Sequence, residues 1–131
     1  MTTMISIEEC EQIGHSAVNR IFKIIATKLN DIHKNATELK FFDQLSIDIT
    51  KEERILQDAF PDVFIEIVTL LKEEYKGLDE LEQHCLFIYL FTNNKDEDEI
   101  VDAMVWHLEE WMEERAYDFI YKANVSTSIL N

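Results

Sequence analysis

The sequence predicts an all-α protein, a single-domain bundle of about five to six helices over residues 1–131 with a long acidic C-terminal helix. The chain has only 2 Gly and 1 Pro, and so lacks the turn residues of a many-stranded β protein. Its 47% hydrophobic content is enough for the core of one domain of 131 residues. Apolar residues recur at three- and four-residue spacing, which is the period of a helix that buries one face.

The first helix is expected over residues 7–32. Ser6 and Glu9 form a capping box, in which side chains satisfy the free backbone N–H groups at a helix start. Gly14 predicts a close crossing by another helix, although an incidental glycine that costs about 1 kcal/mol is the alternative. The expected apolar face consists of Ile7, Cys10, Gly14, Val18, Ile21, Ile25, Leu29 and Ile32.

The middle of the chain is expected to contain shorter helices. Residues 35–49 have a less regular pattern, which indicates a short helix followed by a connector at residues 46–49. Thr50 and Glu53 form a second capping box, so we expect the next helix to begin there. That helix is expected to bury Ile55, Leu56, Ala59 and Phe60.

A proline, a glycine and a third capping box are expected to set the helix ends in the following segment. Pro61 is expected to break or restart the helix, because proline lacks an N–H group and fits best in a first turn. Gly77 is expected to end the helix that follows. Asp79 and Glu82 then predict another helix start, and the apolar run at residues 85–91 indicates a helix buried on most sides.

The cysteines and the apolar runs bear on location. Cys10 and Cys85 occupy apolar helical positions, and two cysteines are too few for a disulfide framework, so we expect reduced core residues. The first 14 residues lack the basic and apolar regions of a secretory signal. The longest apolar run, residues 85–91, is far shorter than the roughly 18 residues of a membrane span. We therefore expect a cytoplasmic protein without membrane contact.

Residues 95–124 form the most informative stretch. At about 100° per residue, one face of the expected helix is apolar: Val101, Met104, Val105, Leu108, Met112, Ala116 and Phe119. The other face alternates carboxylates with large aromatic side chains, a composition that favours partner binding. The candidate partner-binding residues are Glu99, Asp102, Trp106, Glu109, Glu110, Glu113, Glu114, Tyr117 and Tyr121. Two alternatives are burial of these aromatics under another helix of the same chain and burial in a C₂ homodimer.

The net charge of −15 is concentrated near the C-terminal end. Residues 1–78 carry 14 acids and 9 bases, whereas residues 79–118 carry 13 acids and 2 bases. Such a surface repels a phosphate backbone, so direct binding of nucleic acid is not expected. It attracts a basic protein, which is the partner that the sequence predicts.

Patterns that carry catalysis or bind metals are incomplete. The chain has no phosphate-binding glycine motif, and none of its four histidines follows a glutamate by three residues, as in the di-metal sites of helical bundles. We therefore predict no catalytic residue, no metal and no cofactor. The segment EEWME at residues 109–113 resembles the EExxE half of the metal-binding pattern of all-α nucleotide pyrophosphohydrolases of the MazG type. That resemblance implies Mg²⁺ held with a second carboxylate pair from a following helix, but Asp118 is the last acid of the chain.

Three hypotheses explain the acidic surface. The first is an inhibitory binding protein, such as a bacterial cytoplasmic immunity protein or antitoxin that blocks the basic active or substrate-binding site of a nuclease toxin. The second is a phage or plasmid nucleic-acid mimic that inhibits a restriction or CRISPR effector, with Asp79, Glu80 and Glu82 widening the acidic surface. The third is the metal-dependent pyrophosphohydrolase. Of these, we favour the inhibitory binding protein, which is not an enzyme.

Overall fold

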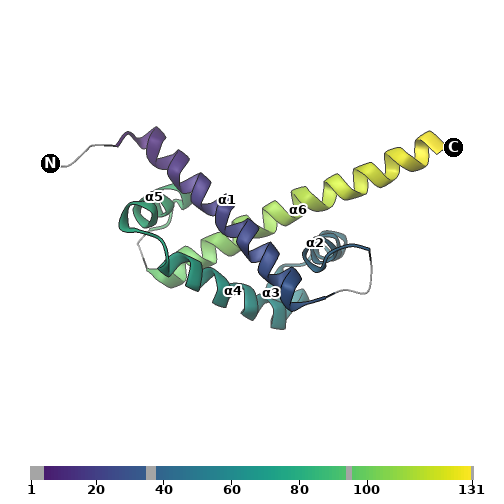
Figure 1. Ribbon diagram of the computed structural model, residues 1–131, viewed down its shortest axis with the longest axis horizontal. Helices are drawn as coiled ribbons and strands as arrows, with labels where there is room; N and C mark the ends of the chain where they lie inside the picture. The colour runs from purple at the N-terminus through teal and green to yellow at the C-terminus, as the bar shows by residue number, and fades with distance from the viewer. Residues whose placement is uncertain (1–4, 35–37, 94–95, 131) are drawn as a thin grey trace. The chain divides into compact units, whose positions relative to one another are not determined.

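Helices form all the regular structure in the part of the chain that the computed structural model describes: residues 5–34, 38–93 and 96–130, with side chains up to residue 121. The helices are α1 (Ile7–Ile32), α2 (Phe41–Glu52), α3 (Leu56–Ala59), α4 (Pro61–Lys76), α5 (Glu80–Leu90) and α6 (Glu97–Leu130) (Figure 1). The all-α prediction is therefore confirmed. Helix α6, with 34 residues, is the long acidic C-terminal helix that the sequence predicts.

The chain forms two compact units, each built from segments that are distant in the sequence. Unit 1 consists of Met1–Ile25 and Glu66–Trp106, and unit 2 consists of Ala26–Ile65 and His107–Asn131. The boundaries fall inside α1, α4 and α6, so each of these helices contributes to both units. A single domain over residues 1–131 stays a prediction.

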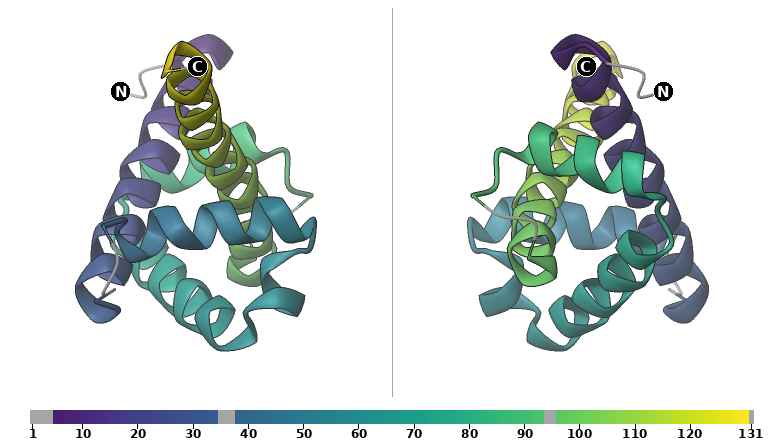
Figure 2. Two further views of the ribbon diagram at one scale, coloured as in Figure 1. Left: turned by 90° about the vertical axis from the view of Figure 1, so that its right-hand side faces the viewer. Right: turned by 90° about the vertical axis from the view of Figure 1, so that its left-hand side faces the viewer.

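Unit 1 is organised around the crossing of α1 and α5. A Cβ atom added to Gly14 would lie 2.6 Å from the carbonyl oxygen of Cys85 and 2.6 Å from Cβ of Tyr89. Only a residue without a side chain allows two helix backbones to approach so closely. The predicted crossing at Gly14 is thus confirmed, and Figure 2 shows α5 passing across the first half of α1.

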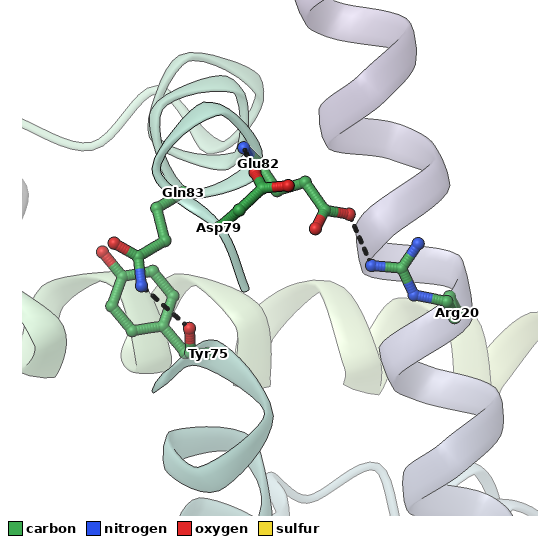
Figure 3. A network of polar contacts seen from close by, with 5 residues as sticks. All are labelled: Arg20, Tyr75, Asp79, Glu82 and Gln83. Atoms are coloured by element: carbon green, nitrogen blue, oxygen red, sulfur yellow. Dashed lines mark hydrogen bonds and ion pairs between the residues drawn. The ribbon is translucent and has the colours of Figure 1, made fainter. Parts of the chain in front are cut away.

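Polar contacts fix the start of α5 to its neighbours in unit 1 (Figure 3). The carboxylate of Asp79 accepts the backbone N–H of Glu82 at 2.8 Å, so the predicted helix start is confirmed. The side chain of Glu82 extends to α1, where Arg20 Nη2 donates to it at 2.6 Å. Gln83 Nε2 donates to the backbone carbonyl of Tyr75, near the end of α4, at 3.1 Å. Helix α5 is therefore joined to both α1 and α4.

Unit 2 is organised around the contact of α2 with α6, which lie side by side in Figures 1 and 2. The Phe42 ring is 1% exposed and lies 5.6 Å from the Trp111 ring, centroid to centroid. The first turn of α2 has no side-chain cap of its own from Lys40. Instead, the side-chain carbonyl of Asn30, on α1, accepts the backbone N–H of Phe42 at 2.8 Å. A residue distant in the sequence thus satisfies the helix start.

The predicted connector at residues 46–49 and the predicted helix start at Thr50 are wrong. Helix α2 continues through both, and Glu53 ends it in the left-handed conformation at φ 53°. The reason is that the hydroxyl groups bond within the helix: Ser46 Oγ donates to the Phe42 carbonyl at 2.8 Å, and Thr50 Oγ1 donates to the Ser46 carbonyl at 2.9 Å. Thr50 therefore lies inside a helix and does not cap one.

The other element predictions differ mainly at their ends. Pro61 begins α4 and Gly77 follows its last residue, as predicted. The expected helix before Pro61 is only the single turn α3, and Ile55 beside it is 52% exposed instead of buried. Phe91, expected inside a buried helix, is the left-handed end residue of α5 and is 84% exposed. On α1, the expected core residues Ile7 and Ile32 are also exposed.

No helix among the described residues has both the length and the apolar character needed to cross a membrane.

Candidate functional site

The orientation of α6 is set by its apolar face. In unit 2, Leu108, Met112 and Ala116 are each 0% exposed, and in unit 1 Met104 is also 0% exposed. Their spacing of four residues keeps them on one side of the helix. The predicted inner face is thus confirmed except at Phe119, which is half-buried. The opposite side of α6 is directed to solvent.

The solvent side of α6 in unit 2 carries acids and tyrosines. Tyr117 is 55% exposed and Tyr121 is 70% exposed, and three acids between residues 110 and 114 are exposed with them. At about 100° per residue, these five side chains lie within roughly 120° of one another around the helix axis. We call them the acid–tyrosine face: Glu110, Glu113, Glu114, Tyr117 and Tyr121.

The carboxylates of this face have few partners among the residues that the structure describes. Among the described residues, Glu113 and Glu114 form no ion pair and no side-chain hydrogen bond. Glu110 Oε2 lies 3.8 Å from His107 Nδ1, a distance that makes any ion pair weak. Among the described residues, the charges of Glu113 and Glu114 are therefore not neutralised by an ion pair.

In unit 1, α6 carries three further candidate residues. Trp106 is 61% exposed, Asp102 is exposed and Glu99 is half-buried. Trp106, Tyr117 and Tyr121 are all exposed, so no helix among the described residues buries these aromatics.

Glu109 differs from the other candidates because its side chain is directed into unit 2. Its carboxylate accepts the backbone N–H of Leu56, the first residue of α3, which has no side-chain cap from Ile55. Burial raises the pKa of Glu109 above its ordinary value, and the hydrogen bond from Leu56 acts in the opposite direction. We therefore assign Glu109 to the packing of α6 against α3 and not to the exposed face.

Arg115 explains why the exposed face lacks positive charge. Its Nη2 donates to the Asp43 carboxylate on α2 at 2.9 Å, and its guanidinium carbon lies 5.0 Å from the centroid of the Trp111 ring. The ion pair and the cation–π contact hold the guanidinium on the inner side of the helix. Arg115 is the only Lys or Arg on α6 before Lys122, so no base interrupts the acid–tyrosine face.

Sequence reasoning missed the role of Arg115 and the exposure of Asp118, which lies between the two tyrosines. The four-residue spacing of Trp111 and Arg115 was a usable signal, because such pairs meet on a helix surface. No sequence signal connects Arg115 with Asp43, which is 72 residues away.

Some of the additional acids proposed for a nucleic-acid mimic already have partners within the chain. Asp79 caps α5, and Glu82 is paired with Arg20, so two of its three extra acids already have partners in unit 1. Glu80 is exposed.

The acids of the EEWME segment diverge. Glu109 turns inward to Leu56, while Glu110 and Glu113 are exposed. Within the described residues, no three His, Cys, Asp or Glu side chains are grouped so that they could hold a metal ion.

Comparison of the chain with protein-family models, with curated proteins and with solved structures gives no match.

Proposed function

We propose that this protein is an inhibitory binding module, an immunity protein or antitoxin that neutralises a basic nuclease-type toxin by covering its substrate-binding site. The observation that carries the proposal is the acid–tyrosine face of α6, where exposed carboxylates and exposed tyrosines share one side of a helix.

Charge supports the proposal through encounter with the partner. A site that binds a nucleic acid is positively charged, and an acidic surface accelerates association with it, especially at low salt. Glu113 and Glu114 enter such a complex without first breaking an ion pair among the described residues. Arg115 pairs with Asp43, so its positive charge is directed away from the acid–tyrosine face.

The tyrosines support it through affinity. Tyrosine gives a large, rigid contact area and a hydroxyl group at a small cost in side-chain entropy, which is why it is common among binding hot spots. Tyr117 and Tyr121 are one helical turn apart, so both rings reach the same partner surface. The inner residues Leu108, Met112 and Ala116 hold this part of α6 in place.

The test is affinity capture from the native host, followed by an activity assay of the captured protein. Tagged wild type is compared with Glu110→Gln/Glu113→Gln and with Tyr117→Ala. The matched charge control is Glu8→Gln/Glu11→Gln, because this pair is also exposed and spaced by three residues on a helix. Phe91→Ala, at an 84% exposed position in unit 1, is the aromatic control.

We expect wild type and both controls to retain one basic protein whose nuclease activity falls when the complex forms. Each variant of the acid–tyrosine face should weaken binding by about 1–3 kcal/mol, roughly 5- to 150-fold, with unchanged helical circular dichroism. If the control variants lost as much affinity, binding would depend on total charge, and the acid–tyrosine face would not be the binding site. Capture of a restriction or CRISPR effector would refute the toxin as the target and support the nucleic-acid mimic. Self-association of the wild type that Tyr117→Ala abolishes would refute the toxin complex and assign the face to a homodimer interface.

A further inference from the structure

The two cysteines of the chain meet inside unit 1. Cys10 lies on α1 and Cys85 on α5, and they are 6% and 0% exposed. Both are free thiols, and their sulfur atoms are 2.9 Å apart. The prediction that both cysteines are core residues is therefore confirmed, but their contact was not evident from the sequence, where 75 residues separate them.

The contact is a consequence of the helix crossing. Gly14 lies one turn after Cys10 on α1 and packs directly on the backbone carbonyl of Cys85. Because Gly14 has no Cβ atom, the two backbones approach to a separation at which short side chains such as cysteine touch. A disulfide bond is about 2.05 Å long, so the sulfur atoms need to move together by only about 0.9 Å.

We propose that Cys10 and Cys85 form a redox-modification site, at which a small hydroperoxide converts the two thiols into an intramolecular disulfide that locks α1 to α5. The inference is independent of the acid–tyrosine face, because it concerns other residues of other helices.

The reaction balances in two steps. The Cys10 sulfur attacks the peroxide, the O–O bond breaks, and the products are a sulfenic acid on Cys10 and one molecule of water or alcohol. The Cys85 sulfur then attacks the Cys10 sulfur while the Cys85 proton passes to the leaving hydroxyl group, so that the S–S bond forms and the S–O bond breaks with release of water. The two sulfur atoms supply the two electrons that reduce the peroxide, and both thiol protons end in the released products.

The surroundings of the two sulfurs fix this order. Cys10 is the more exposed of the two and is the fourth residue of α1, so local opening of this helix end would admit a small oxidant. Cys85 is fully buried, and burial together with the Cys10 contact raises its pKa to about 12, so it stays a thiol at neutral pH. Cys10 therefore reacts first, and Cys85 is already in contact with the sulfenic acid that forms.

The test treats the native protein with hydrogen peroxide and follows the intact mass. Since the chain has only 2 cysteines, any intramolecular disulfide must join Cys10 to Cys85. The urea-unfolded protein and the folded Cys85→Ala variant are treated in parallel. Folding of the variant is checked by circular dichroism, and the wild-type measurement stands without it.

We expect the native monomer to lose two hydrogen atoms and both titratable thiols together, with recovery in dithiothreitol. Its thermal midpoint should rise by about 15 °C, because the bond closes a loop of about 75 residues in the unfolded chain. Cys85→Ala should instead gain oxygen atoms on Cys10. Thiols that resist peroxide until urea is added would overturn the proposal. So would oxygen atoms accumulating on wild-type Cys10 while Cys85 remains a thiol, or disulfide-linked dimers.

Discussion

The substitution Gly14→Ala should destabilise the protein, although alanine is the better helix former. The new Cβ atom would lie 2.6 Å from the Cys85 carbonyl oxygen and 2.6 Å from the Tyr89 Cβ atom. Ordinary contact begins at 3.4 Å, so α1 and α5 must separate by about 0.8 Å. Neither contacted atom is at the end of a flexible side chain, and no rotamer change relieves the overlap.

The magnitude follows from two opposing effects. Replacing glycine by alanine inside a helix stabilises by about 1 kcal/mol. Overpacking a rigid contact costs about 1–3 kcal/mol, and two backbone-linked atoms in contact place this site at the upper end. The net loss is therefore about 2 kcal/mol, equivalent to a fall in the thermal midpoint of roughly 6–8 °C.

Urea unfolding followed by circular dichroism measures this difference, and the second glycine gives the control. At Gly77 the nearest atoms to an added Cβ are 3.5 and 3.7 Å away, and its φ is not positive. Gly77→Ala should therefore be neutral or stabilise by up to about 1 kcal/mol. A Gly14→Ala protein as stable as Gly77→Ala would refute the close crossing of α1 and α5.

Three further substitutions test contacts within unit 2 or within unit 1. Arg115→Met should lower the free energy of unfolding by about 1–2 kcal/mol, since Asp43, 15% exposed, loses its partner; a double-mutant cycle with Asp43→Asn in urea checks this, and strict additivity would contradict it. Burial raises the pKa of Glu109 in the folded state. Protonation of Glu109 therefore stabilises the folded protein fully below the unfolded pKa of about 4.3, and this stabilisation is lost as the pH rises through the folded pKa. In urea titrations, the free energy of unfolding of Glu109→Gln should therefore rise relative to that of wild type between acidic and neutral pH. A difference in this free energy that does not change with pH would speak against a buried carboxyl group. Asp79→Ala should cost about 1 kcal/mol in thermal unfolding and Asp79→Asn much less, whereas equal losses would remove the capping role.

Local patterns predicted the long helices well. The period of apolar residues and the Ser6 hydroxyl, which accepts the Glu9 backbone N–H at 3.1 Å, place α1 at Ile7–Ile32 as expected. The inner face of α6 was equally readable, because its core residues repeat over several turns.

Short-range patterns failed where two local solutions compete. Thr50 followed by Glu53 fits a helix start, yet a threonine hydroxyl also bonds to the carbonyl four residues earlier, and this solution is the one adopted in α2. Phe91 belongs to an apolar run, but the chain must turn after α5, and Phe91 takes the left-handed position there. Only packing against the rest of each unit selects between such alternatives.

The sequence by itself determined that the protein is helical, that its negative charge is concentrated near the C-terminal end, and that one side of α6 combines acids with aromatic residues. These properties depend on composition and on the helical period, which are local. Tertiary structure alone decided that Glu109 turns inward to α3, that Arg115 pairs with Asp43, and that Cys10 touches Cys85. Each of these contacts joins residues more than 50 positions apart, and no local pattern encodes which distant segments will pack together.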